Sequence, residues 1–130
     1  MKWSLQQLIK YNGKPFSFEG TYDFTDYIKN IDDILRIGLF TVNGVGQNLY
    51  DDRYSFQLEI KGSLFLQCAR TLQEVEYPLD LQVEEVFDKN VKDDEDVRLI
   101  DKNTIDLKDV VWENILLEKP IRVVKDHTDD

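Results

Sequence analysis

The chain has 130 residues, 42% of them hydrophobic, which is enough for one domain built around one core. Its formal net charge is −10, and the whole excess lies in residues 73–130, where eight bases face eighteen acids. Because an acidic surface repels phosphate backbones and no apolar run reaches the length of a membrane span, neither DNA nor a membrane is an expected partner. The charge suits a basic protein partner, or a solvated face that only confers solubility.

A short helix and a strand are the first expected elements. Ser4 and Gln7 form a capping-box pattern that begins a helix, and Asn12-Gly13 can end it in a left-handed turn. Over residues 16–24 aromatic and polar residues alternate, and this period of two is typical of a strand. Residues 26–33 are polar and are expected to form a turn or a short helix.

A second strand and two turns follow. Leu35, Ile37 and Leu39 resume the apolar alternation of a strand, which continues to residue 42. Residues 43–46 (NGVG) and Asp51-Asp52 have the composition of turns. We therefore expect the chain to reverse at both places.

The longest pattern predicts a hairpin. Apolar residues occupy the even positions from 54 to 68 apart from Gly62 and, after a short polar turn at Arg70-Thr71, the odd positions from 75 to 87 apart from Glu85. Gly62 is a possible bend, and Pro78 indicates an edge strand or a bulge because it has no N–H to donate. The outward positions of the second strand carry an acidic row that would protect that edge from intermolecular pairing. This row consists of Glu74, Glu76, Asp80 and Glu84.

The last third of the chain predicts a loop, a strand and a helix. Residues 88–96 are densely charged and are expected to be a flexible loop, followed by a short strand over residues 97–100. Asp106 can cap a helix that starts at Leu107, has apolar positions as far as Leu117 and stops at Pro120. This helix is expected to pack on the concave side of the sheet. The sequence thus predicts an α+β fold, mainly a curved antiparallel sheet, as one domain over residues 1–124 with a disordered tail at 125–130.

No constellation of residues indicates catalysis, a cofactor or a metal. His127 lies in the polar tail, and Cys68 sits on the apolar stripe, so a buried structural thiol is favoured over a nucleophile. One histidine and one cysteine cannot form a zinc site alone, and residues 93–96 lack the spacing of a calcium loop. The single cysteine and the polar N-terminus favour the cytoplasm. A pocket that joins Arg70, Asp109 and Glu113 would be needed to indicate an enzyme.

Two segments resemble one known family. Residues 61–72 (KGSLFLQCARTL) resemble the YceD family's strand that ends in Cys-x-Arg-Cys, and residues 104–120 (TIDLKDVVWENILLEKP) resemble its Ile-Asp-Leu, Glu-x-Ile-x-Leu and Pro pattern. Their order and separation match, as does the acidic loop between them, and residues 2–5 (KWSL) are similar to the start of Gram-positive members. Members usually extend some tens of residues further, so we expect a C-terminally trimmed chain or a short member.

The resemblance implies a function. The family is that of the large ribosomal RNA subunit accumulation protein, which implies a cytosolic, non-enzymatic role in the synthesis, processing or stability of 23S ribosomal RNA. The expected partner is a basic ribosomal protein or an rRNA-processing factor, with any RNA contact indirect or confined to the neutral first half. Thr71 stands where the family has its second cysteine, which argues against a metal or redox role for this turn. The candidate interaction residues are Cys68, Arg70, Thr71, Glu74, Glu76, Asp80, Glu84, Asp106 and Glu113.

A second hypothesis is a carrier of a small ligand. A curved sheet closed by an apolar helix can enclose a pocket, which would be lined by the even-numbered stripe from Tyr54 to Cys68. A solid core at this place would argue against the carrier.

Overall fold

The computed structural model describes residues 1–92 and 96–120. The expectations for residues 93–95 and for the tail with His127 lie outside the described residues. In chain order the elements are β1 (Lys2–Ser4), α1 (Leu5–Leu8), the 3-10 helix η1 (Ile9–Tyr11), β2 (Phe16–Tyr22), the 3-10 helix η2 (Thr25–Ile28), β3 (Ile34–Ile37), β4 (Phe40–Tyr50), β5 (Arg53–Gln67), β6 (Glu74–Asp88), β7 (Arg98–Leu99), β8 (Thr104–Asp106) and α2 (Lys108–Glu118).

Most strands belong to one curved sheet, which confirms the α+β prediction. Its order is β2-β4-β5-β6-β7, and β3 also pairs with β5. β6 and β7 are parallel, whereas the other pairs in this sheet are antiparallel. β5 and β6 pair in a constant register from Tyr54↔Phe87 to Gln67↔Glu74, as expected for the long hairpin. β1 and β8 form a separate two-stranded sheet.

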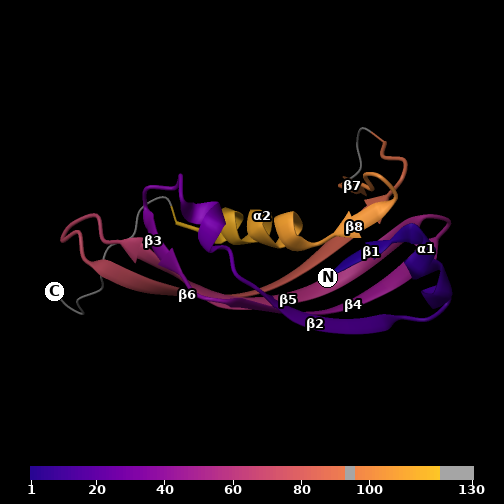
Figure 1. Cartoon of the computed structure of the whole chain (residues 1–130), viewed down its shortest axis with the longest axis horizontal. Coiled ribbons are helices and arrows are strands. Elements are labelled where there is room, and N and C mark those ends of the chain that lie inside the picture. The colour runs from indigo at the N-terminus through magenta and orange to yellow at the C-terminus, as the bar shows by residue number, and fades with distance from the viewer. Residues whose placement is uncertain (93–95, 121–130) are drawn as a thin grey trace.

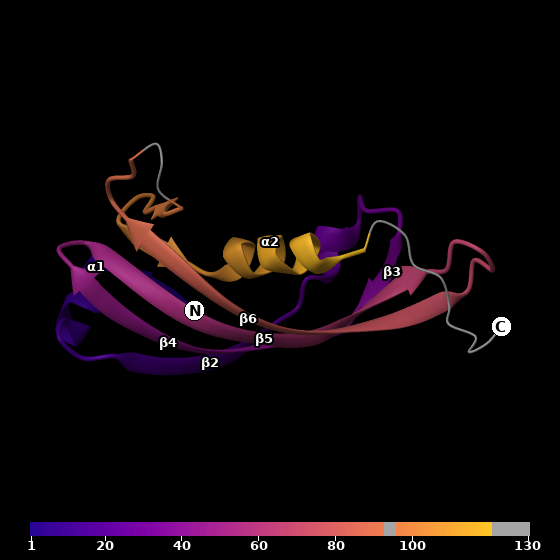
Figure 2. The ribbon, with the colours of Figure 1, turned by 180° about the vertical axis from the view of Figure 1, so that it is seen from behind.

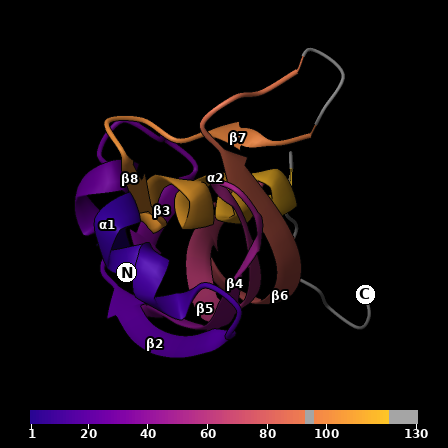
Figure 3. The same cartoon turned by 90° about the vertical axis from the view of Figure 1, so that its right-hand side faces the viewer.

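The core lies between the sheet and α2. Figure 1 shows α2 on the concave side of the strands, and the end view in Figure 3 shows the sheet bending around it. On the sheet side, the apolar even-numbered residues from Tyr54 to Cys68, which lie in β5 and directly after it, are buried. From the helix side, α2 buries Val110, Val111, Trp112 and Ile115. This packing confirms the expected position of the C-terminal helix.

The N-terminus forms the predicted helix and one strand that the sequence analysis missed. The capping box is present, because the Gln7 N–H donates to Ser4 Oγ (3.1 Å) and the Ser4 N–H donates to Gln7 Oε1 (2.9 Å). Before this helix, β1 pairs with β8 and places Trp3 opposite Ile105. The Trp3 ring stacks on the ring of Phe56 with centroids 5.4 Å apart, so β1 is anchored on the core.

The predicted turn at residues 43–46 is wrong, because these residues lie inside β4. Their glycines face inward, opposite aromatic residues of β2: Phe16 pairs with Gly46 and Phe18 with Gly44. A Cβ on Gly46 would lie 2.5 Å from Cζ of Phe16. The glycines therefore make room for aromatic rings rather than for a change in chain direction.

The alternation expected for Leu35, Ile37 and Leu39 is also wrong. Leu35 and Leu39 are exposed, and Leu39 has 63% of its surface in solvent. Ile37 and Thr41 are four positions apart in the sequence, whereas their partners Leu64 and Lys61 on β5 are three positions apart. An extra residue on one strand reverses the phase of its side chains, so Leu39 turns outward.

The helix α2 differs slightly from expectation. It begins at Lys108, one residue later than predicted, and Asp106 Oδ1 accepts the N–H of Lys108 (3.0 Å). Leu117 was expected on the apolar face but is 80% exposed. Among the described residues, we find no helix with the length and apolar character needed to cross a membrane.

Candidate interaction surface

The acidic row of Glu74, Glu76, Asp80 and Glu84 lies along β6 on the outer face of the sheet. All four side chains belong to exposed residues, whereas the alternate residues Leu79 and Phe87 are buried. Since successive side chains of a strand point to opposite faces, the row and the core occupy opposite sides of β6. The row is therefore accessible from the side that α2 does not cover.

One end of the row is fixed by an arginine. Arg36 of β3 donates from Nε to Glu74 Oε1 and from Nη2 to Glu74 Oε2, each at 3.0 Å. Its guanidinium also lies 3.7 Å from the ring centroid of Phe65. Stacking on Phe65 and the forked ion pair with Glu74 hold the Arg36 side chain in one orientation. Because both partners of the ion pair are exposed, it adds little to the stability of the fold.

The middle and far end of the row make cross-strand hydrogen bonds to β5. Ser63 Oγ donates to Glu76 Oε2 (2.8 Å), and both Ser55 Oγ (2.9 Å) and Gln57 Nε2 (3.1 Å) donate to Glu84 Oε2. These donors are neutral. The carboxylates are therefore oriented by β5 while their negative charge is retained.

An open hollow continues this acidic face across the sheet. Its volume is about 990 Å³. The outward side chains that line it are Ser17, Glu19, Asn43, Val45, Gln57, Glu59, Gln82 and Glu84. Beyond Glu84, which belongs to the acidic row, the hollow adds the two carboxylates Glu19 and Glu59. Lys61 Nζ lies 3.7 Å from Glu59 Oε2, so Glu19 contributes most of the added negative charge.

The hairpin turn is held by Cys68, which is buried as expected. Its N–H donates to the carbonyl of Gln73 (2.8 Å), and its own carbonyl accepts the N–H of Leu72 (2.9 Å). The Thr71 N–H lies 3.5 Å from Cys68 Sγ. Arg70 and Thr71 are exposed at this end of the molecule, which projects beyond α2 in Figure 1.

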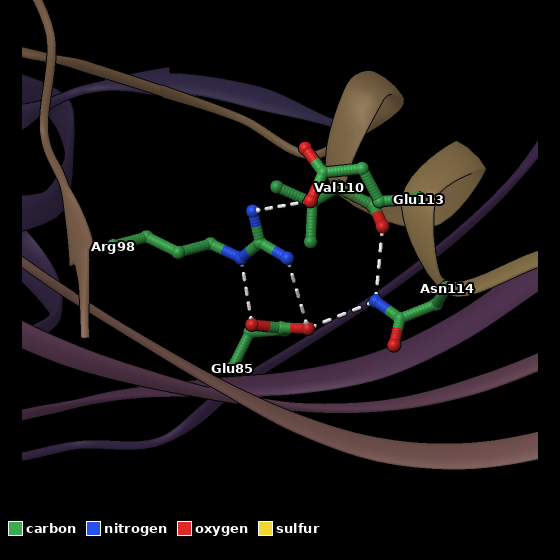
Figure 4. Close-up of polar contacts among 5 residues, drawn as sticks. All are labelled: Glu85, Arg98, Val110, Glu113 and Asn114. Atoms are coloured by element: carbon green, nitrogen blue, oxygen red, sulfur yellow. Dashed lines mark hydrogen bonds and ion pairs between the residues drawn. The ribbon is translucent and has the colours of Figure 1, made fainter. Parts of the chain in front are cut away.

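A polar cluster that sequence reasoning missed joins β6, β7 and α2 (Figure 4). Arg98 donates to Glu85 Oε1 from Nε (2.7 Å) and to Glu113 Oε1 from Nη1 (3.1 Å). Asn114 Nδ2 donates to Glu85 Oε2 (2.8 Å) and to the carbonyl of Val110 (2.9 Å). The adjacent polar residues Glu113 and Asn114 on α2 were the one local signal of this cluster. Their partners Glu85 and Arg98 lie too far away in the sequence to be recognised from it.

The start of α2 carries a second polar contact. Tyr27 Oη donates to Asp109 Oδ1 (2.7 Å), and this hydrogen bond raises the pKa of Tyr27 to about 12. Nearby, Tyr22 has its hydroxyl buried without a hydrogen-bond partner among the described residues, and burial raises the pKa of this phenol strongly. Both tyrosines therefore stay neutral near physiological pH.

The predicted site residues do not form one cluster. The acidic row faces outward from β6, and the residues around Cys68 form the hairpin turn. Asp106 is the last residue of β8, and Glu113 lies in the middle of α2. Asp109 and Glu113 lie one turn apart on α2, where Asp109 contacts Tyr27 and Glu113 contacts Arg98, whereas Arg70 is exposed in the hairpin turn. Within residues 1–92 and 96–120, no three carboxylate, thiol or imidazole side chains are close enough to hold a metal ion.

Comparison with known proteins finds one family and one similar protein. Residues 56–130 match the sequence model of the family described as large ribosomal RNA subunit accumulation protein YceD. The chain is also 34% identical, over 126 residues, to the uncharacterized protein YlbN of Bacillus subtilis (strain 168). That alignment covers 95% of this chain and 73% of the relative. No solved structure shows a significant match.

Proposed function

The chain belongs to the YceD family of large ribosomal RNA subunit accumulation proteins, and on that premise we propose that it is a non-enzymatic accessory factor of large-subunit biogenesis. It acts by binding, and it supports the synthesis, processing or stability of 23S ribosomal RNA. The family name supports the link to ribosomal RNA accumulation. The mode of action is inferred from the charge and exposure of the described residues.

The observation that carries the proposal is the acidic outer face of the β5–β6 hairpin. The inner face of this hairpin is filled by the core with α2, so its outer face is the side on which a partner can dock. Carboxylates there repel the phosphates of RNA and attract cationic side chains. The partner is therefore a basic ribosomal protein or an rRNA-processing factor, and any direct RNA contact lies on the near-neutral residues 1–72.

The packing of the β5 stripe argues against the carrier of a small ligand. Tyr54, Phe56, Ile60 and Leu64 are at most 1% exposed and belong to the same core cluster as the apolar residues of α2. These side chains fill the space that a ligand would occupy. The hollow on the outer face is open to solvent, and its position fits a docking surface better than an enclosed pocket.

Capture from a cell lysate tests the proposed mode of binding. The wild-type chain is expected to retain large-subunit components at low salt and less of them at moderate salt, because exposed charges are screened. The double variant Asp80→Asn with Glu84→Gln should retain less. A matched control, Asp26→Asn with Glu118→Gln, removes two exposed charges elsewhere and should behave like the wild type. Recovery of no ribosomal component at either salt would sink the proposal.

A further inference from the structure

We propose that the open edge of β6 binds an extended basic segment of a partner protein as an added β-strand. This inference rests on the proposed function and specifies how its partner is recognised. The sheet ends at β6 along most of its length, because β7 pairs with only Phe87 and Asp88. Residues 74–86 therefore have β5 on one side and no strand of the described chain on the other. Figure 2 shows β6 in front of β5, with α2 above the sheet.

Two hydrogen bonds identify the residues whose backbone groups point to this edge. The carbonyl of Gln73, an odd-numbered residue, accepts the N–H of Cys68 on the β5 side. The carbonyl of Asp88, an even-numbered residue, accepts the N–H of Ile100 beyond β7. Because the backbone groups of an antiparallel strand alternate between its two neighbours and the register is constant, the even-numbered residues of β6 direct theirs to the open edge.

Pro78 agrees with this assignment. It is even-numbered and pairs with Ser63 without any shift in register, so it forms an edge position and not a bulge. Its missing N–H falls on the open side and costs no hydrogen bond to β5. Pro78 also interrupts the row of edge donors. The free edge therefore runs from residue 79 to residue 86, between Pro78 and β7, and spans about 26 Å.

The side chains along this edge specify the occupant. Asp80, Gln82 and Glu84 are exposed on the outer face, while Leu81 and Val83 are half-buried on the inner face. Successive side chains of an added strand would lie alternately beside the exposed acidic residues of the outer face and beside the apolar residues of the inner face. The matching segment therefore alternates Lys or Arg with apolar residues. A second copy of β6 would set its own carboxylates against this row, so the charge disfavours self-pairing.

The test uses a synthetic ten-residue peptide of alternating lysine and valine and a variant pair at Gln82. Gln82→Pro removes one edge N–H and keeps the bonds to β5, as Pro78 does, whereas Gln82→Ala removes the side chain but keeps the N–H. We expect the wild type and Gln82→Ala to bind the peptide within twofold of each other, and Gln82→Pro to bind it at least tenfold more weakly. A peptide with alternate backbone nitrogens methylated should also lose binding at least tenfold.

Amide hydrogen exchange gives an independent measurement. On peptide addition, the N–H groups of Asp80, Gln82, Glu84 and Val86 should exchange more slowly, because they are the donors at the edge. The odd-numbered amides between them already donate to β5 and should change little. Three results would overturn the inference. The wild type could fail to bind the peptide, the proline and alanine variants could bind it equally, or the edge amides could be protected by self-association of the protein in the absence of peptide.

A cellular assay separates this inference from the proposed function. If Gln82→Ala restores the large-subunit peak in a deletion strain and a folded Gln82→Pro does not, the result supports binding of the partner by strand addition at the edge of β6. If both variants restore it fully, strand addition is wrong while the role in large-subunit biogenesis stands. If the wild-type gene has no effect on that peak, the proposed function itself fails.

Discussion

Among single residues, Arg98 makes contacts that join three elements of the fold. It belongs to β7, and its guanidinium reaches Glu85 on β6 and Glu113 on α2. The side chain of Glu85 is only 16% exposed, so its carboxylate depends on protein donors. Glu113 is 56% exposed and can be hydrated instead. The two halves of this cluster should therefore differ in their contribution to stability.

This difference predicts unequal effects of two substitutions. Arg98→Ala should lower the free energy of unfolding by about 1.5–3 kcal/mol, since it removes charged hydrogen bonds from a nearly buried carboxylate. Glu113→Gln should cost less than about 1 kcal/mol, as is typical of exposed pairs. Urea denaturation measures both values. Equal losses, or a larger loss for Glu113→Gln, would contradict the assigned roles.

A second ion pair predicts a pH dependence. Arg53 Nε donates to Asp88 Oδ2 (2.8 Å), and both side chains are nearly buried. Burial alone would raise the pKa of Asp88, but the hydrogen bonds from the Asn90 backbone and from Arg53 outweigh it and hold that pKa below its ordinary value. A carboxyl with a lowered pKa in the folded state stabilises the fold above its unfolded pKa of about 3.9 and loses this contribution as the pH falls through the folded value.

The variant Asp88→Asn should therefore be less stable than the wild type at pH 7, by about 1–3 kcal/mol. The difference should begin to shrink as the pH falls below about 4, the unfolded pKa, and should vanish once the pH is below the folded pKa of Asp88. Denaturant unfolding at a series of pH values measures the difference. Curves that stay parallel down to the acid range would show that Asp88 contributes no pH-dependent stability.

Among the elements, β5 contains a glycine that the packing requires. A Cβ on Gly62 would lie 2.6 Å from Cγ of Phe40, whose ring is fully buried. Gly62→Ala should therefore destabilise the fold by about 1–3 kcal/mol through overpacking. Gly38→Ala is the matched control, since its nearest neighbour is the Ser63 carbonyl oxygen at 3.8 Å, an ordinary contact. Thermal unfolding should show a lower Tm for Gly62→Ala only, and a similar loss at Gly38 would refute the packing argument.

The hairpin and α2 could be predicted from the sequence because their side-chain periods extend over many residues. The even-to-odd change of phase around Arg70-Thr71 predicts β5 and β6, and the acidic row follows from the same alternation. Residues 43–46 misled the prediction because glycines that make room for aromatic rings have the composition of a turn. β1 and β8 have three residues each, too few to show a period.

The polar contacts were predictable only where they are local. The Ser4 capping box and the Asp106 contact with Lys108 join residues two or three positions apart. The cluster of Arg98 joins β6, β7 and α2, and nothing in the local sequence indicates that these elements meet. Pro78 indicated an edge from the sequence, but the backbone direction along β6 follows from the hydrogen bonds of the Gln73 and Asp88 carbonyls with Cys68 and Ile100.

At the scale of the whole molecule, the two faces of the curved sheet have different roles. α2 and the aromatic residues of the first half bury the inner face, which stabilises the fold. The outer face carries the acidic row and the hollow, and the edge of β6 beside it has no neighbouring strand over residues 74–86 in the part of the chain that the structure describes. We infer that this surface recognises a basic partner during assembly of the large ribosomal subunit.

Sedimentation of ribosomal particles from cells with and without the gene tests this role most directly. The account predicts a smaller large-subunit peak relative to the small subunit in the deletion strain, and its recovery when the wild-type gene is restored. An unchanged large-subunit peak in the deletion strain would contradict it.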